Sequence, residues 1–182
     1  MNDKIKLITP LSLGLPKTGQ ETVYAIGDDA TYQAGWWLNT VIATNRTRFI
    51  EKEIVSGEIV ILDLATGLMR PKDGSAAGCN DGNVTNWFDA ISFCNALNFS
   101  GFNNWRLPNV LELITMCNFS VRNPSVWDTF TNIQTAEASR YWTSSTYKTL
   151  TTQAWYISFL DAYASAQNKT QGQHLWPVRT IS

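Results

Sequence analysis

The sequence has 182 residues and lacks a long apolar run, a cluster of basic residues and a large net charge of either sign. A membrane helix needs about 20 consecutive apolar residues, so we expect no membrane insertion. Charged residues make up 16% of the chain, against roughly 25% in an average globular protein. With a net charge of −1, the broad positive surface typical of nucleic-acid-binding proteins is missing. Nucleic acid is therefore not an expected partner.

Catalytic motifs are also absent. Histidine occurs once, as His174, and no zinc-protease, phosphate-loop, dinucleotide-binding or paired-cysteine motif is present. The pair Ser144-Ser145 lacks the flanking glycines of a nucleophile elbow. We expect no enzymatic activity, no catalytic residue and no cofactor.

Cysteine is scarce, with only Cys79, Cys94 and Cys117. Three cysteines allow at most one internal disulfide, so their redox state and the cellular compartment stay open. Cys94 falls on the apolar face of an expected helix, which favours a buried small hydrophobe. The glycine-rich stretch from residue 73 to 83 offers oxygen ligands, but their spacing does not match an EF-hand. Calcium dependence stays open, and we assign no metal site.

Aromatic and uncharged polar residues are abundant: eight Trp, eight Phe, six Tyr, 20 Thr and 15 Asn. A chain of this length buries about 70% of the surface that its unfolded form exposes, which suffices for one well-packed domain. Residues 1–45 carry turn signals and the pair Trp36-Trp37 but little periodicity. We interpret them as a lead-in that packs on the domain or serves in assembly, and residues 46–182 as the domain itself.

Three segments have readable secondary structure. The β-rich run at residues 58–63 predicts a short buried strand. Apolar residues at helical spacing from Trp87 predict a helix that Gly101 ends. A second helix is expected after Pro108, because Asn109 and Glu112 have the spacing of a capping box.

The pattern changes to period two after residue 141. Trp155, Ile157 and Phe159 alternate with Tyr156 and Ser158, which predicts a strand with one buried face and one face open to a partner. The neighbouring stretches 146–153 and 161–173 are rich in Thr, Tyr, Ser, Asn and Gln. Such side chains make adaptable hydrogen bonds, as in antibody paratopes. The alternative interpretation is two solvated hairpin loops.

Four strings together resemble a known family. They are Thr66-Gly67-Leu68-Met69, the helix start from Trp105 through Pro108 to Leu113, Tyr141-Trp142-Thr143-Ser144-Ser145, and the final Val178-Arg179. The chain resembles the C-terminal domain family of a bacterial collagen-like adhesin, Lcl. The resemblance implies an α+β, C-type-lectin-like fold, in which two helices pack on short, mostly antiparallel sheets with much loop. It also implies that Trp105, Arg106, Trp142, Trp155 and Arg179 hold the scaffold.

The functional expectation from this resemblance is a non-catalytic ligand-binding protein for adhesion or receptor recognition. In a finer hypothesis, the C-terminal face is varied by a diversity-generating retroelement, as in some C-type-lectin-like proteins. The candidate contact residues are Tyr147, Thr149, Thr151, Gln153, Tyr156, Ser158, Asp161, Tyr163, Ser165, Asn168 and Gln171.

The resemblance favours a protein or glycan receptor on a cell surface as partner, and an extracellular, cell-surface or virion-associated location. Glycosaminoglycan binding is the alternative, with Lys148, Lys169 and Arg179 as its cations. A remote alternative is an oxidase related to formylglycine-generating enzymes. Those relatives use a C-terminal thiol pair, whereas the last cysteine here is Cys117. The oligomeric state stays open.

Overall fold

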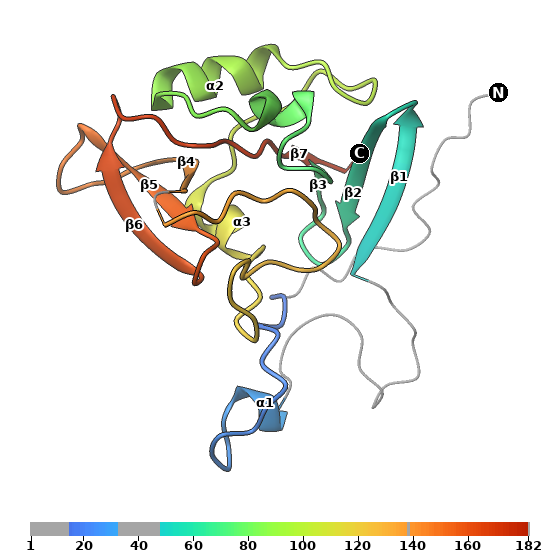
Figure 1. Cartoon of the computed structure of the whole chain (residues 1–182), viewed down its shortest axis with the longest axis vertical. Coiled ribbons are helices and arrows are strands. Elements are labelled where there is room, and N and C mark those ends of the chain that lie inside the picture. Colours follow the sequence, from blue (N-terminus) through green and yellow to red (C-terminus); the bar gives the residue numbers. More distant parts are fainter. Residues whose placement is uncertain (1–14, 33–47, 138, 182) are drawn as a thin grey trace.

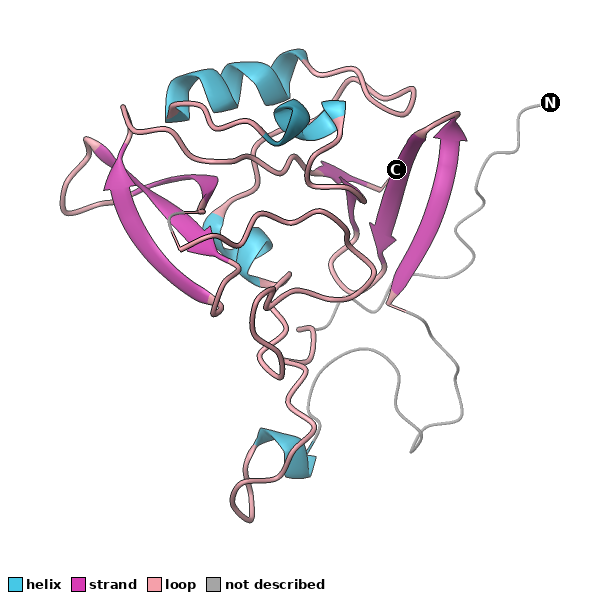
Figure 2. Ribbon diagram, in the orientation of Figure 1, coloured by secondary structure: helices cyan, strands magenta, loops and turns pink. Residues whose placement is uncertain are grey.

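A computed structural model describes residues 15–32, 48–137 and 139–181, and these residues have the predicted α+β class (Figure 1). Two small antiparallel sheets lie on opposite sides of the molecule, with helices and long loops between them (Figure 2). The first has the order β1-β2-β3-β7, formed by β1 (Phe49–Val55), β2 (Glu58–Asp63), β3 (Leu68–Pro71) and β7 (Arg179–Thr180). The second comprises β4 (Tyr141–Thr146), β5 (Gln153–Ser158) and β6 (Tyr163–Asn168). The described helices are α1 (Asp29–Tyr32), the 3-10 helix η1 (Ala77–Gly82), α2 (Trp87–Ala96) and α3 (Val110–Ile114). The finer assignment to a C-type-lectin-like fold stays a prediction.

Helix α2 begins at the predicted Trp87, and Asn86 caps it by accepting hydrogen bonds from backbone N–H groups of the first turn at 3.1 and 3.0 Å. The prediction that Gly101 ends this helix is wrong. The helix ends at residue 96, because the backbone of Leu97 is extended and takes Phe99 into the core. Gly101, with a φ of 75°, lies in the tight turn that follows Phe99.

Helix α3 begins with the predicted capping box. The Asn109 side chain accepts from the Glu112 N–H at 2.9 Å, and the Glu112 carboxylate accepts from the Asn109 N–H at 2.8 Å. Arg106 donates to both Glu112 carboxylate oxygens at 2.7 and 2.6 Å, as a paired scaffold residue should. The neighbouring Trp105 packs edge-on against Phe99 in the core. The helix start is thereby fixed by charge-assisted hydrogen bonds.

Strand β5 is buried on both faces, which corrects the predicted alternation. Ala154 and Tyr156 belong to the hydrophobic cluster that includes α2 residues, whereas Ile157 and Phe159 belong to the main core. Tyr156 is 5% exposed and Ser158 is 1% exposed, so the face expected to be open is closed at both positions. The reason is position: β5 is the central strand, α2 contacts β4, and α3 contacts β4 and β5.

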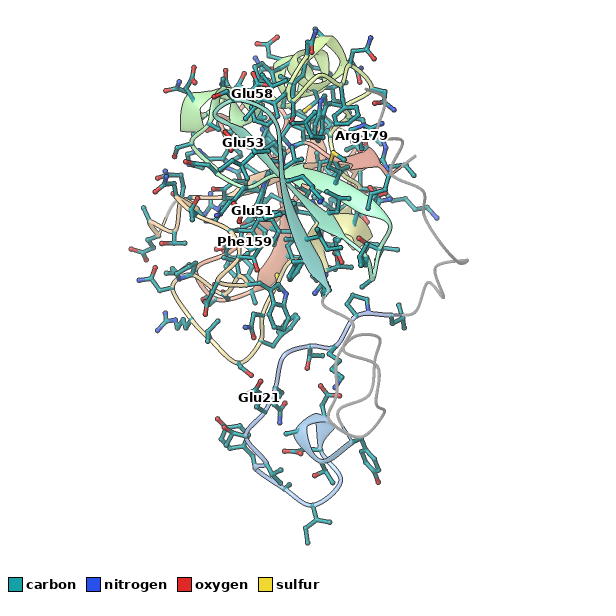
Figure 3. The ribbon with its side chains drawn as sticks, turned by 90° about the vertical axis from the view of Figure 1, so that its right-hand side faces the viewer. Glu21, Glu51, Glu53, Glu58, Phe159 and Arg179 are labelled. Atoms are coloured by element: carbon teal, nitrogen blue, oxygen red, sulfur yellow. The ribbon has the colours of Figure 1, made fainter. Side chains whose placement is uncertain are left out.

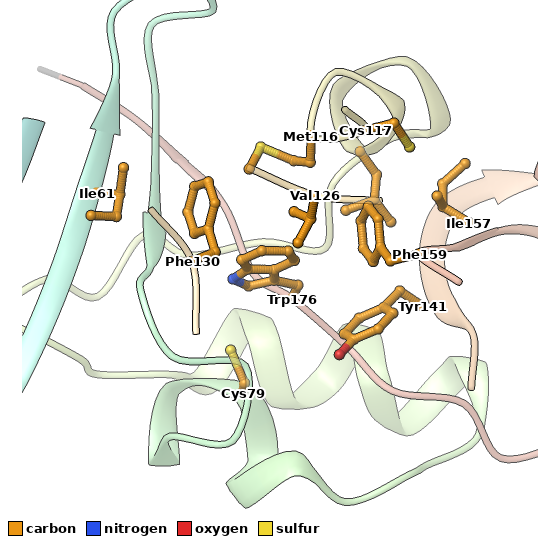
Figure 4. Packing of buried hydrophobic residues seen from close by; sticks show 11 residues of the cluster. Ile61, Cys79, Met116, Cys117, Val126, Phe130, Tyr141, Ile157, Phe159 and Trp176 are labelled. Atoms are coloured by element: carbon orange, nitrogen blue, oxygen red, sulfur yellow. The ribbon is translucent and has the colours of Figure 1, made fainter. Parts of the chain in front are cut away.

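The main core fills the space between the two sheets (Figure 4). Trp176 lies at its centre, fully buried, with its indole N–H donating to the Pro71 carbonyl at 2.9 Å. Its ring meets Phe130 and Phe159 at centroid distances of 4.9 and 5.7 Å, both nearly perpendicular. Such edge-to-face pairs add to the stabilisation from area burial alone. Trp176 therefore joins residues of both sheets.

All three cysteines are buried free thiols. Burial raises the pKa of Cys94 and that of Cys117 to about 12, and it also raises the pKa of Cys79 well above its ordinary value. Cys94 is fully buried in the cluster with α2 residues, which confirms the interpretation as a small hydrophobe. Thiols with raised pKa values stay protonated and are poor nucleophiles.

Buried arginines tie the four-stranded sheet to α3. Arg48 donates to both carboxylate oxygens of Asp63 at 2.9 and 2.8 Å and also reaches the Thr115 carbonyl at 2.8 Å. Arg70 is completely buried and donates to the Glu112 carbonyl at 2.8 Å. Both guanidinium groups thus meet backbone carbonyls at the C-terminal end of α3, where cations are favoured.

The described part of the lead-in touches the body of the domain over a short stretch. The Phe119 N–H donates to the Thr18 carbonyl at 2.9 Å, and Lys17 is buried. The chain then leads away to α1, which lies apart from both sheets (Figure 1). The pair Trp36-Trp37 and the predicted boundary between residues 45 and 46 lie outside the described residues, so the domain division stays a prediction.

Candidate ligand-binding surface

The structure places the eleven candidate contact residues at three depths. Exposed residues are Thr149, Thr151, Asp161, Tyr163, Asn168 and Gln171. Half-buried residues are Tyr147, Gln153 and Ser165, and the buried pair is Tyr156 and Ser158. Ser158 has a local structural role, because its hydroxyl accepts from the N–H of Leu160 in the turn after β5. Tyr156 and Ser158 are therefore corrected from outward positions to interior ones.

The accessible candidates do not form one cluster, because they gather at both ends of the β4–β5–β6 sheet. Gln153 pairs with Asn168 at one end, and Ser158 pairs with Tyr163 at the other. Five residue steps of about 3.4 Å separate these pairs, which gives roughly 17 Å. The sheet consequently carries two separate groups of accessible polar side chains.

The turn between β4 and β5 is held by its backbone. The Tyr147 N–H donates to the Gln153 carbonyl at 2.9 Å, the Gln153 N–H donates to the Leu150 carbonyl at 2.9 Å, and the Leu150 N–H donates to the Tyr147 carbonyl at 3.2 Å. The side chains of Thr149 and Thr151 extend from this frame into solvent. They are free to contact a ligand without breaking a hydrogen bond of the turn.

An arginine that the sequence analysis missed lies between the two ends. The guanidinium carbon of Arg140 is 5.0 Å from the centroid of the Tyr156 ring, within cation–π range. Tyr163 lies beside Tyr156, with 6.1 Å between the two ring centroids. Ser165 of β6 is the direct strand partner of Tyr156. Among the described residues, Arg140 has no carboxylate within ion-pair distance. We call Arg140, Tyr156, Tyr163 and Ser165 the Arg140 cluster.

The three cations considered for glycosaminoglycan binding do not form one surface. Lys148 is exposed in the β4–β5 turn. Lys169 is 9% exposed, donates to the Thr146 hydroxyl at 2.8 Å and lies 4.0 Å from the Trp87 ring centroid. Arg179 is in the other sheet, where it donates to Asn104 at 2.7 Å. These three residues therefore form no continuous basic track, and Arg140 is the better-placed cation.

Three of the predicted scaffold residues, Trp105, Trp142 and Arg179, are fully or nearly fully buried. Trp142 is inaccessible and its indole N–H donates to the Thr85 carbonyl at 3.0 Å. Arg179 is 4% exposed and packs over the Phe102 ring at 3.9 Å. Trp155 is only half-buried and meets the Tyr147 ring edge-on at 5.2 Å. Trp155 thus supports the β4–β5 turn from the surface of the sheet.

His174 connects the C-terminal sheet to the glycine-rich loop. Its Nδ1 lies 2.9 Å from the Gly82 carbonyl oxygen, and its ring is 5.3 Å from that of Tyr141. A carbonyl only accepts, so Nδ1 carries the proton of the neutral ring. Burial lowers the pKa of His174 below its ordinary value, and the Gly82 hydrogen bond opposes this shift in part.

We expect His174 to make folding stability depend on pH in weakly acidic solution. Because its folded-state pKa is depressed, the unfolded chain binds the proton more readily. The contribution of the neutral ring is complete above the unfolded pKa of about 6.5 and is lost as the pH falls through the folded pKa. Urea unfolding at pH 7.5 and at 5.5 should show a larger loss of stability in the wild type than in His174→Gln. Equal losses in the two proteins would contradict this assignment.

Two features are absent from the described parts of the chain. No helix in residues 15–32, 48–137 or 139–181 has the length and apolarity to cross a membrane. Within the same ranges, no three His, Cys, Asp or Glu side chains gather as a metal-ligand group. In the glycine-rich loop, the Asp73 carboxylate instead accepts from the Ser75 N–H at 2.7 Å and from Asn132 at 2.8 Å.

The profile of the Lcl C-terminal domain matches residues 59–179, from β2 to the first residue of β7. This span contains 121 of the 182 residues, which is well over half of the chain. The chain belongs to the Lcl C-terminal domain family. It is thus an adhesin-like C-terminal domain, and the family span includes the whole β4–β5–β6 sheet with the Arg140 cluster. No curated protein sequence gives a significant match.

Proposed function

We propose that this member of the Lcl C-terminal domain family is a non-catalytic domain that binds a receptor on a cell surface. The proposed contact surface is the accessible part of the Arg140 cluster, namely Arg140, Tyr163 and Ser165, together with the exposed residues of the two turns. The membership of the chain in this family supports an adhesive role and a surface-associated or extracellular location. The buried cysteines, with their raised pKa values, give no support to the oxidase alternative.

The Arg140 cluster is the observation that carries this proposal. A guanidinium held against an aromatic ring without a carboxylate partner keeps hydrogen-bond donors available for an incoming ligand. Tyr163 is 38% exposed beside it and offers a rigid aromatic surface with a hydroxyl group. Arg and Tyr are the residue types enriched among the energetically dominant contacts of protein interfaces.

The test is binding of the purified chain to cells of candidate hosts, compared among matched variants. Tyr163→Ala and Arg140→Ala should each weaken binding by at least about tenfold, or 1.4 kcal/mol, as expected for central contacts. The controls are Tyr24→Ala and Arg122→Ala, which remove the same side-chain types at exposed positions outside this surface. Equal effects in test and control variants would refute the proposed surface.

A glycan with acidic groups is the second candidate ligand, and the observation that favours it is the available guanidinium of Arg140. Retention on immobilised heparin should then decrease with salt and decrease further in Arg140→Ala. Arg122→Ala should elute like the wild type. If retention is absent, or insensitive to salt, the ligand is not a sulfated polysaccharide.

The retroelement hypothesis applies to the same surface. Sequences of many natural copies of the gene should then differ mainly at the exposed turn and edge positions, such as Thr149, Thr151 and Tyr163. Trp142 and Phe159 should be constant because both are fully buried. A segment after residue 140 that varies no more than the preceding part would instead point to one dedicated ligand.

A further inference from the structure

Strand β6 has one side without a strand neighbour. The order of its sheet is β4-β5-β6, so the inner side of β6 pairs with β5 over six residue pairs. None of the residues described pairs with its outer side. β6 and β1 lie on opposite sides of the molecule (Figure 1). The outer side of β6 is thus a free sheet edge.

The pattern of hydrogen bonds between β5 and β6 shows which backbone groups of β6 point away from β5. The N–H of Lys169 donates to the Thr152 carbonyl at 2.9 Å, so this pair is a hydrogen-bonded one. Hydrogen-bonded and non-hydrogen-bonded pairs alternate in an antiparallel ladder. Ser165 therefore faces β5 with its backbone groups, whereas Ala164 and Ala166 direct their N–H and C=O groups outward. The outer edge presents a row of alternating donors and acceptors.

The edge strand of the other sheet, β1, carries charged residues that oppose pairing with another chain, whereas β6 does not. Strand β1 carries Glu51, Lys52 and Glu53. The side chains of Glu51 and Glu53 are labelled along this strand in Figure 3. Charged residues are a common means by which edge strands avoid pairing with another chain. Strand β6 has the sequence Tyr-Ala-Ser-Ala-Gln-Asn, without a charge or a proline. It has the length of an average strand and no device that blocks pairing.

We propose that β6 pairs antiparallel with β6 of a second copy of this chain. Only an extended backbone matches a row of outward N–H and C=O groups at strand spacing. The strand suits its own copy because it opposes no like charges and its central residues Ala164, Ser165 and Ala166 are small. The contact is isologous and closes on itself as a dimer. This inference does not rest on the proposed function.

Such pairing determines how the two copies are oriented relative to each other. The twofold axis of an antiparallel strand pair runs perpendicular to the sheet, so equivalent faces of both copies point the same way. The two Arg140 clusters then lie on one side of a continuous six-stranded sheet. A dimer with this geometry would present two equivalent surfaces to one target surface, which raises avidity without a new contact.

The test compares two substitutions at one position by sedimentation over a wide range of protein concentration. Ala166→Pro removes an outward N–H that the pairing with β5 does not use, whereas Ala166→Val retains it and adds the same number of carbon atoms. The wild type and Ala166→Val should dimerise, and Ala166→Pro should raise the dissociation constant by at least about tenfold. Ser165→Lys, which places two cations across the twofold axis, should also weaken the dimer.

Amide hydrogen exchange gives an independent readout. Exchange at Ala164 and Ala166 should slow as the protein concentration rises, in the wild type but not in Ser165→Lys. A chain that is monomeric at every concentration would overturn the proposal, as would an Ala166→Pro variant that dimerises like Ala166→Val. Slow exchange at these two amides only after a foreign protein is added would instead assign the edge to a strand of another partner.

Discussion

Replacing Trp176 with Ala should lower the free energy of unfolding by about 3–5 kcal/mol, the range for deleting a fully buried aromatic side chain. Trp176 has no exposed surface, packs against Phe130 and Phe159, and donates a hydrogen bond to the Pro71 carbonyl. Its removal opens a cavity between the two sheets and leaves that carbonyl without its donor. Since domains are stable by only about 5–15 kcal/mol, much of the total would be lost.

Urea unfolding followed by circular dichroism measures this loss. Trp176→Phe retains a ring in the site and should cost less, about 1–3 kcal/mol for the carbonyl left without its partner. Trp155→Ala is the control, because Trp155 is only half-buried on the surface of β5. If Trp176→Ala costs no more than Trp155→Ala, then Trp176 does not join the sheets as described.

The second large effect is expected from the ion pair between Arg48 and Asp63. Both side chains are almost inaccessible, at 2% and 1% exposure, and the N–H of Ala65 also donates to Asp63 at 3.0 Å. Asp63→Ala leaves the guanidinium charge inside the protein without its carboxylate. Breaking a buried pair in this way costs about 3–5 kcal/mol, measured as the change in unfolding free energy.

The exposed pair of Lys72 and Glu51 provides the matched control on the same sheet. These side chains are 25% and 49% exposed at a comparable distance of 2.7 Å, so Glu51→Ala should cost less than about 1 kcal/mol. A double variant with Arg48→Met and Asp63→Leu should recover much of the loss, because apolar replacement of a buried pair is often nearly neutral. Similar costs for Asp63→Ala and Glu51→Ala would show that burial does not determine the strength of this pair.

Local signals predicted the elements that local interactions determine. The capping box at Asn109 and Glu112 was readable because both partners lie within one helical turn. The start of α2 at Trp87 was readable from helical periodicity. Strand β6 was interpreted as a loop, because its Ala, Ser, Gln and Asn residues have low strand propensity and only pairing with β5 makes it a strand. β1 was also missed, since its charged middle hides the pattern.

The candidate site was predicted in part for the same reason. The exposed turn residues, such as Thr149 and Thr151, followed from composition. The burial of Tyr156 could not be predicted from the sequence, because burial on both faces of β5 depends on elements that are distant in sequence. Arg140 gave only a weak signal, a single cation immediately before the Tyr141-Trp142 pair. Its position over the Tyr156 ring requires the tertiary fold.

The backbone-only hydrogen bonding of the β4–β5 turn has a practical consequence for protein engineering. Because the turn is closed by the backbone groups of Tyr147, Leu150 and Gln153, its shape does not depend on the side chains at Thr149 and Thr151. A laboratory library randomised at these two positions should retain the expression yield and unfolding midpoint of the parent. Selection from such a library would then sort variants by affinity alone.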